Sequence, residues 1–393
     1  MDLNNNIGKA YDRISKLPDS LINHILSFLD IKLVARTCIL SKRWKYIWTS
    51  IPTLVFPYFL PNPPSLSETN KFMEFVDRTL VLHDESNIQK CHLTTNELMS
   101  ASRFHLWIEN LTRRNIQELE LWLDQDKPFY IPLSLFRCES LNKLELIANN
   151  GTRLPGTFIF PKLKSLKLIG IQFTDNDCWK EQHFSNCHVL EDLILEDCTW
   201  FGVSDFCIST PTLKLLEICN LTWAEEGLQN CALEIHVPNL VSLTYCGSVA
   251  REYVLSSFQT LESAKVHLCE YGNVLRKQQI GFAAYLRKLY LETYAETLES
   301  CIDENEENEH SWASHMLTAG CMFQHLQSVT YVRFSGNERE MRWVKLISKN
   351  AKDLRTIRLY LRSDDLINKK VLKSEFQSLP KASESCEFEF KEC

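Results

Sequence analysis

The segment CWKEQHFSNCHVLED contains the thiols and imidazoles that come closest to a metal-ligand set in this chain. Cys178, His183, Cys187 and His188 offer the sulfur and nitrogen ligands that structural zinc sites use. Their spacing matches no common zinc pattern, and the segment lies between two repeated strand sequences. We therefore interpret these four residues as structural and expect no metal centre there.

A second segment, SKRWKYIW at residues 41–48, combines three cations with three aromatic rings, a mixture that suits phosphates and bases. Trp44, Ile47 and Trp48 fall on one helical face at i, i+3 and i+4, so their rings should point into a core and cannot stack on bases. The chain also carries 43 Lys and Arg against 50 Asp and Glu, a net charge of −7 that opposes phosphate binding. We expect no nucleic-acid binding.

The sequence contains none of the common catalytic signatures: no P-loop, no dinucleotide-binding glycine pattern, no H-E-x-x-H and no G-x-S-x-G. His310 and His315 follow an acidic run and are interpreted as surface residues. The 15 cysteines show no C-x-x-C spacing, which favours reduced, buried thiols in the nucleus or cytoplasm. We predict a protein that is not an enzyme and needs no cofactor, with no membrane span and no secretion signal.

Residues 1–12 are polar, and the predicted helices and strands that would carry a functional surface begin after them. LPDSLINHILSFLD predicts a helix with a wide apolar stripe, formed by Leu21, Ile22, Ile25, Leu26 and Leu29. Asp30 is expected to cap a second short helix and Ser41 a third. Helices this short leave apolar surface uncovered, which implies a partner.

From about residue 88 the chain repeats the pattern L-x-x-L-x-L. Equivalent positions fall at 119, 144, 166, 193, 216, 243, 264 and 289, and the gaps of 21 to 27 residues match a leucine-rich repeat. The proline-rich segment 57–64 and a predicted helix over Asn70–Leu82 precede the repeats, and Phe72, Phe75, Val76 and Leu80 are expected to face inward. The acidic run DENEENEH at 303–310 interrupts the repeats and is expected to be a solvated loop.

At this point the residues resemble a known family. LPDSLINHILSFLDIKLVARTCILSKRWKYIWTSIPTLVF closely resembles the F-box of plant proteins that carry an F-box, leucine-rich repeats and a C-terminal FBD domain. IPLSLFRCESLNKLEL and FSNCHVLEDLILEDC resemble the repeats of that family, and FQHLQSVTYVRFSGNEREMRWVKLISKNAKDLRTIRL resembles the FBD segment.

The resemblance implies an α/β chain with a three-helix F-box, an irregular leucine-rich-repeat solenoid and an FBD segment, which either continues or caps the solenoid. The expected divisions are a flexible N-terminus at 1–12, the F-box at 13–55, a linker and helix at 56–85, the repeats at 86–300, an acidic loop at 301–311 and the FBD domain at 312–393.

The same resemblance implies a substrate receptor of an SCF-type cullin–RING ubiquitin ligase, in which the F-box binds a Skp-family adaptor. The residues implied for the adaptor interface, or for the small core behind it, are Leu17, Pro18, Leu21, Ile25, Leu26, Leu40, Ser41, Trp44 and Trp48. Without the adaptor, the surface of Leu21, Ile25 and Trp44 is expected to stay exposed. The chain departs from the family at Asp30, where proline is usual, and at Leu33, where an acidic residue is common.

The repeats are expected to bind a protein substrate through strand residues that alternate outward. This candidate face consists of Glu120, Trp122, Lys143, Glu145, Lys167, Glu217, Lys265 and Tyr290. Its mixed charges favour a protein or peptide over a polyanion. Two alternatives stay open: an adaptor-binding protein that targets no substrate, and a repeat scaffold whose N-terminal helices pack on its own solenoid. The sequence does not choose between nucleus and cytoplasm, since it has no long run of Lys and Arg; Lys369 and Lys370 come closest to one.

Overall fold

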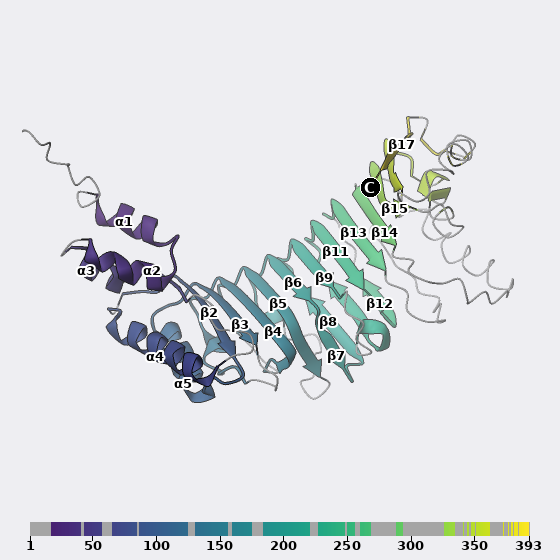
Figure 1. Cartoon of the computed structure of the whole chain (residues 1–393). Coiled ribbons are helices and arrows are strands. Elements are labelled where there is room, and N and C mark those ends of the chain that lie inside the picture. Colours follow the sequence, from purple (N-terminus) through teal and green to yellow (C-terminus); the bar gives the residue numbers. More distant parts are fainter. Residues whose placement is uncertain are drawn as a thin grey trace, which may run out of the picture. The chain divides into compact units, whose positions relative to one another are not determined.

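The structure is a computed structural model of the 393-residue chain (Figure 1). It describes residues 17–40, 43–56, 65–84, 86–124, 130–155, 159–174, 184–220, 227–247, 250–255, 260–268, 288–293, 326–334 and 351–361, with parts of 341–349 and 372–392. The chain divides into two units, residues 1–149 and 150–393. The predictions for residues 1–12, Ser41, 57–64, Cys178, His183, 303–310, His315 and Lys369–Lys370 lie outside the described residues.

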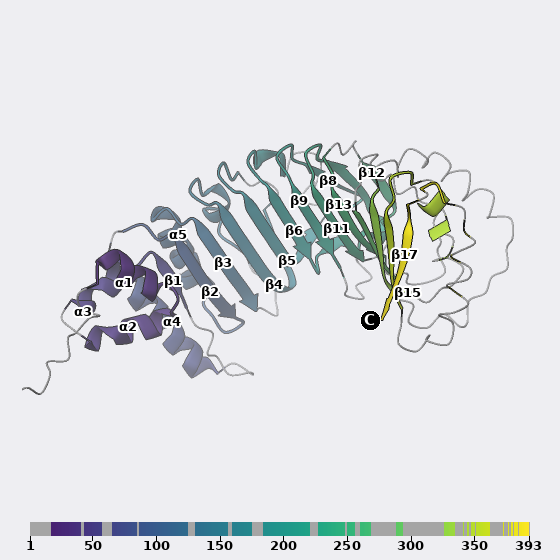
Figure 2. The same ribbon diagram turned by 90° about the horizontal axis from the view of Figure 1, so that it is seen from above.

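The first unit begins with three short α-helices, α1 (Asp19–Leu26), α2 (Ile31–Arg36) and α3 (Trp44–Ile47). The 3-10 turn η1 (Thr37–Ile39) follows α2, and the 3-10 turn η2 (Trp48–Ser50) follows α3. Figure 2 shows the three helices gathered into one group. As predicted, Asp30 caps α2: its Oδ1 accepts from the amide of Leu33 at 2.8 Å. Ile22, Leu26, Ile31, Val34 and Trp44 form the small core of the group.

The remainder of the first unit is a parallel sheet with two helices. The strands β1 (Thr53–Val55), β2 (Lys90–Asn96), β3 (Glu118–Asp124) and β4 (Lys143–Arg153) pair in this order. Helix α4 (Leu66–Leu82) begins four residues before the predicted start, and α5 (Ala101–Arg113) forms the return segment between β2 and β3. On α4, Val76 and Leu80 are buried as expected, whereas Phe72 and Phe75 are half-buried. Trp107 Nε1 of α5 donates to Asp77 of α4 at 2.6 Å, which joins the two helices.

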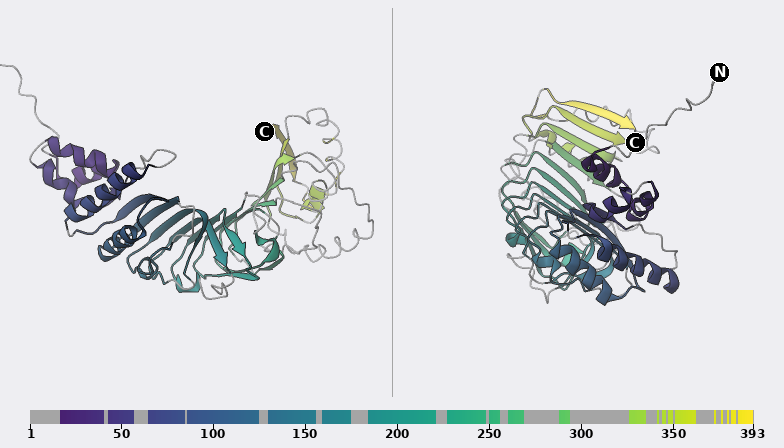
Figure 3. Two further views of the ribbon diagram at one scale, coloured as in Figure 1. Left: turned by 60° about the horizontal axis from the view of Figure 1, so that its bottom comes forward. Right: turned by 90° about the vertical axis from the view of Figure 1, so that its left-hand side faces the viewer.

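The second unit contains a longer parallel sheet. Its strands are β5 (Ser165–Thr174), β6 (Asp192–Glu196), β9 (Leu215–Cys219), β11 (Ser242–Gly247), β13 (Ser263–Leu268), β14 (Lys288–Thr293), β15 (Ser328–Phe334), β16 (Thr356–Leu361) and β17 (Glu387–Glu392). They pair in this order (Figure 3). The buried residues Leu166, Leu193, Leu216 and Leu243 stand in one register row, as the repeat predicted. Since β15 pairs with β14, the strands of the C-terminal segment continue the solenoid.

A smaller sheet of β8 (Asp205–Ser209), β10 (Ala232–His236) and β12 (Glu252–Leu255) forms from the return segments, and a short strand β7 (Thr199–Phe201) pairs with β5. The core lies between the two sheets: the ring of Phe206 on β8 lies 5.0 Å from that of Phe173 on β5 and 5.6 Å from that of Trp200 on β7. The described cysteines carry free thiols and are buried or half-buried, as expected. Among the described residues, no helix is long and apolar enough to cross a bilayer.

Candidate functional site

The three N-terminal helices expose an unusual amount of apolar side chain. Leu21 and Ile25 of α1 and Phe28 just after it lie at i, i+4 and i+7 and are 49%, 45% and 76% exposed, while Ile22 and Leu26 of α1 are buried. The set of exposed apolar residues in this group, called here the apolar set, comprises Leu21, Ile25, Phe28, Leu33, Ile39, Leu40 and Tyr46. A folded domain that leaves this many apolar residues in water is a candidate for protein binding.

The sequence-predicted interface residues divide into two groups. Pro18, Leu21, Ile25 and Leu40 are exposed, and Leu17 and Trp48 are half-buried. Leu26 and Trp44 are 1% and 3% exposed and belong to the core. The expectation that Trp44 shares an exposed surface with Leu21 and Ile25 is therefore wrong, because the face formed by Trp44 and Ile47 closes the core of the helices.

Sequence reasoning missed four members of the apolar set. Phe28, Leu33, Ile39 and Tyr46 are 76%, 42%, 85% and 67% exposed, and Leu33 was noted only as a departure from the family pattern. Phe28 had a signal, because it continues the i, i+4, i+7 row of Leu21 and Ile25. Ile39 and Tyr46 had none, since apolar residues in a short helical segment are normally assigned to the core.

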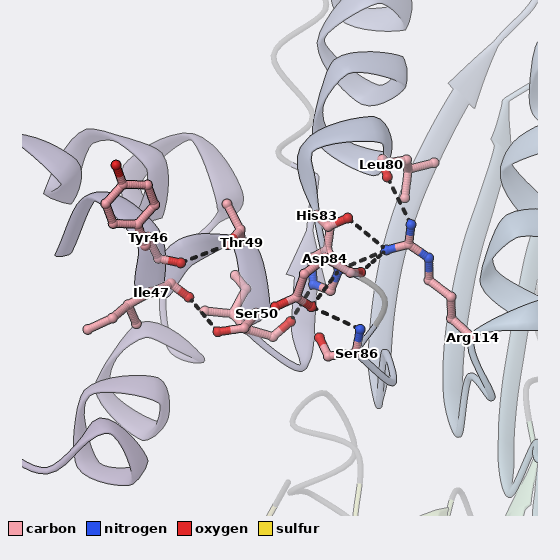
Figure 4. Close-up of polar contacts among 10 residues, drawn as sticks. Tyr46, Ile47, Thr49, Ser50, Leu80, His83, Asp84, Ser86 and Arg114 are labelled. Carbon is pink, nitrogen blue, oxygen red and sulfur yellow. Dashed lines mark hydrogen bonds and ion pairs between the residues drawn. The ribbon is translucent and has the colours of Figure 1, made fainter. Parts of the chain in front are cut away.

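A buried polar junction fixes the helical group to the rest of the first unit (Figure 4). His83, at the end of α4, is 3% exposed. Its Nδ1 lies 2.8 Å from Arg114 Nη1, and because a guanidinium can only donate, Nδ1 accepts. The ring proton therefore resides on Nε2, which donates to the carbonyl of Ile51 at 2.8 Å. Arg114 also donates to the carbonyls of Asp84 (2.7 Å) and Leu80 (3.1 Å).

A backbone hydrogen bond from Asp84 to the carbonyl of Thr49, 2.7 Å long, completes this junction. The segment after α3 and the end of α4 are thus joined by a buried side chain and a main-chain bond. These bonds hold the segment between α3 and β1 against the end of α4.

The predicted substrate face of the first unit is built around Trp122 of β3, which is 42% exposed. Its indole donates to Glu120 at 2.8 Å, and the ring of His92 on β2 lies 5.5 Å away. On β4, Lys143 donates to Glu145 at 2.7 Å, and this bond with the carboxylate raises the pKa of the lysine. The sheet register places Glu120 beside Glu145 and Glu118 beside Lys143.

In the second unit the register brings the other predicted face residues into one outward row. Ile194 on β6 lies between Lys167 on β5 and Glu217 on β9. In the next strands of the same row, Thr244 lies between Glu217 and Lys265, and Lys265 is paired with Tyr290. The row continues through Thr330 and Arg358 to Glu389, and the last two form an ion pair of 3.0 Å. The side chain of Tyr290 is outside the described ones.

Two residues after Glu217 on β9, Cys219 is paired with Cys246 of β11. The thiol of Cys219 also donates to Glu217 at 3.6 Å. Its pKa is raised by the hydrogen bond to Cys246, by burial and by the negative charge of Glu217, so the thiol stays protonated at neutral pH. Of the cluster considered at the outset, Cys187 is buried, with its pKa raised by burial to about 12, and His188 is exposed.

Comparison with known protein families gives two matches, one over the N-terminal helices and one over the repeat strands. The F-box domain family matches residues 14–56, which include the apolar set. The family described as "FBD-associated F-box protein At5g56370, LRR repeats" matches residues 104–253, which include β3 to β11.

Several proteins of Arabidopsis thaliana are similar to this chain. The F-box/LRR-repeat protein At4g14103 is 33% identical over 261 residues, covering 65% of this chain and 68% of the relative. The F-box/LRR-repeat protein At4g14096 is also 33% identical, over 65% of this chain and 54% of its own length. The FBD-associated F-box protein At3g52670 is 25% identical over 97% of both chains. The chain spans about half the length of At4g14096 and of several other relatives, but 97% of At3g52670.

Proposed function

The chain belongs to the F-box/LRR-repeat proteins of plants, and from this premise we propose that it is the substrate receptor of an SCF-type cullin–RING ubiquitin ligase. The family resemblance inferred from the sequence is confirmed, and so is the fold class of an F-box followed by stacked repeat strands. In this proposal the F-box binds a Skp-family adaptor, and the repeats bind a protein substrate.

The observation that carries the proposal is the apolar set on the F-box. Full burial of one such side chain stabilises a complex by about 1.5–3 kcal/mol, and residues such as Ile39 and Phe28 are mostly in water in the chain by itself. An apolar adaptor surface would bury them. The buried side chains Ile22, Leu26 and Trp44 hold the helices in place behind this surface.

The proposed role is non-catalytic. A receptor accelerates ubiquitin transfer by raising the effective concentration of a substrate lysine near the charged conjugating enzyme. The buried junction at His83 supports this role, because a receptor must keep its adaptor-binding and substrate-binding parts in a defined relation. Reduced, buried thiols agree with a site of action in the nucleus or cytoplasm.

The substrate in this proposal is a protein or peptide bound along the outward strand residues. Trp122 with Glu120 and His92 offers an aromatic anchor with polar neighbours, which is the composition of an interaction hot spot. The outward row of the second unit alternates in charge between Lys167, Glu217 and Lys265, so it suits a ligand with both charge signs.

The test is binding of the full-length chain to a purified Skp-family adaptor. We expect the double variant Leu21→Ala/Ile25→Ala to weaken binding at least tenfold, and Leu17→Ala/Pro18→Ala to weaken it as well. Val81→Ala/Leu82→Ala, which shortens exposed apolar residues on α4, is the matched control and should bind like the wild type. Equal binding by all variants, or none by the wild type, would refute the proposal.

A second experiment separates a ligase receptor from an adaptor-binding scaffold that targets no substrate. Proteins that co-purify with the chain are compared between the wild type and Trp122→Ala, and their turnover is followed with the chain present or absent. A protein that is lost from the Trp122→Ala complex and is degraded only with the wild type supports the receptor. Adaptor binding with no change in the turnover of any bound protein supports the scaffold.

A further inference from the structure

The small sheet formed by the return segments holds a cluster of three different metal-ligating side chains. Cys207 lies on β8, and Glu234 and His236 lie on β10. The sulfur, a carboxylate oxygen and an imidazole nitrogen all lie within 4.8 Å of one another. The register explains the gathering, because Cys207 pairs directly with Glu234, and His236 follows two residues later on the same face of the strand.

The strand alternation places this cluster on the face of the small sheet that points away from the core. Phe206 and Ile208 of β8 are fully buried and face the core, as do Leu233 and Ile235 of β10. Cys207 points to the other face and is nevertheless only 4% exposed. The side chains of Glu234 and His236 are 29% and 39% exposed. The thiol thus forms the floor of the cluster, and the carboxylate and imidazole form its solvent-accessible rim.

The ligand types select the metal. A thiolate with an imidazole favours zinc and disfavours Mg²⁺ and Ca²⁺, which take oxygen ligands. Zinc holds its ligands at about 2.0–2.3 Å in a tetrahedron, so two ligand atoms on one ion lie roughly 3.3–3.8 Å apart. His236 Nε2 and Glu234 Oε2 are already 3.7 Å apart. The sulfur of Cys207 lies within 4.8 Å of both atoms.

We propose that Cys207, Glu234 and His236 bind one Zn²⁺ ion. Three protein ligands leave a fourth coordination position on the exposed rim, which is open to water or to a donor group of a bound protein. The ion would join β8 to β10 and stabilise the small sheet. Because the thiol must lose its proton and the imidazole must be neutral, zinc affinity would fall as the pH is lowered.

The test uses the full-length chain, freed of metal by a chelator and then titrated with Zn²⁺ and separately with Co²⁺. We expect one equivalent of Zn²⁺ to bind and to raise the midpoint of thermal unfolding. We also expect Co²⁺ to give the absorption of a tetrahedral ion and a sulfur-to-cobalt charge-transfer band. In Cys207→Ser the charge-transfer band should disappear, and in His236→Gln zinc affinity should fall at least tenfold.

Matched controls exclude the other thiols and imidazoles of the chain. Cys198→Ser removes a buried thiol from the main core, and His188→Gln removes an exposed imidazole; both should bind both metals like the wild type. His236→Gln and Glu234→Gln keep the test valid if Cys207→Ser unfolds, because both positions are partly exposed. The proposal is overturned if the wild type binds no zinc, or if the cobalt spectrum survives in the Cys207 variant and both rim variants bind zinc normally.

Discussion

At the scale of single residues, the most constrained side chain in the first unit is His83. Both ring nitrogens have partners: the carbonyl of Ile51 accepts from Nε2, and Arg114 donates to Nδ1. Loss or rotation of this buried imidazole removes the donor to the Ile51 carbonyl and one of the acceptors of Arg114, whose bonds to the carbonyls of Asp84 and Leu80 remain.

The first prediction follows from this geometry. His83→Ala should destabilise the chain by about 1–3 kcal/mol, the cost of leaving buried polar partners without hydrogen bonds. The measurement is urea unfolding of the full-length protein. His105→Ala is the control, because His105 also bonds a carbonyl, that of Tyr130 at 2.9 Å, but on an exposed surface. Equal losses in the two variants would show that the junction at His83 contributes nothing beyond an ordinary surface hydrogen bond.

Buried thiols give a second prediction at this scale. Burial raises the pKa of Cys187, Cys198 and Cys231 from 9.0 to about 12. The folded state therefore binds protons that the unfolded chain releases, so this stabilisation is complete below pH 9 and is lost as the pH rises toward 12. At pH 10 it has decreased by an amount on the order of 1 kcal/mol per thiol. Unfolding measured between pH 8 and 11 should show a shallower decline for Cys198→Ala than for the wild type, and parallel curves would contradict the prediction.

At the scale of elements, a sequence pattern predicted the secondary structure correctly where it was compatible with a single structure. The L-x-x-L-x-L pieces became the strands β3, β4, β5, β6, β9, β11, β13 and β14, and Asp30 became the cap of α2. The wide stripe of the first helix was ambiguous, because five apolar positions exceed what a short helix buries on one side. The structure resolves it into a buried pair, Ile22 and Leu26, and an exposed pair, Leu21 and Ile25.

The zinc-binding candidate could not be predicted from the sequence for a related reason. DFCIS and ALEIH lack the repeat pattern, so nothing identified β8 and β10 as neighbours. Cys207 and Glu234 are 27 residues apart, and only the register between these strands brings them together. Spacing rules detect ligands that are close along the chain, and they miss ligands that a parallel sheet assembles.

The cap of α2 provides the third prediction. The family usually has proline at this position, and Asp30 replaces it with a side chain that accepts from the Leu33 amide. Asp30→Ala should destabilise the F-box by about 0.5–2 kcal/mol, whereas Asp30→Asn keeps the acceptor and should be nearly neutral. Hydrogen exchange of the α2 amides measures the effect directly. Identical exchange in both variants would mean that the cap is not what starts this helix.

The fourth prediction concerns the strands of the solenoid. Leu193 on β6 is fully buried between Leu166 and Leu216, and its truncation leaves a cavity in the stacked core. Leu193→Ala should cost about 2–5 kcal/mol. Ile194→Ala, the next residue on the same strand, removes a half-buried outward side chain and should cost clearly less. Thermal unfolding of the two variants decides the point, and equal shifts would contradict the assigned inward face of β6.

At the scale of the whole molecule, two properties of the chain oppose each other. A net charge of −7 keeps molecules apart, but exposed charges act over only about 8 Å at physiological salt. The apolar set of the F-box attracts at contact and is not screened. We therefore expect the solubility of the chain without its proposed adaptor to depend on charge repulsion between molecules.

The fifth prediction is that the isolated full-length chain self-associates through the F-box, and more strongly as salt is added. Sedimentation at low and high salt measures this. Leu21→Gln/Ile25→Gln should shift the protein toward monomer, because it removes apolar contact area without touching the buried core. Leu66→Gln/Val81→Gln, exposed apolar positions on α4, is the control and should associate like the wild type. Addition of the adaptor should abolish association of the wild type, since the adaptor would occupy the same residues. Association that persists in the F-box variant would show that another surface of the chain mediates self-association.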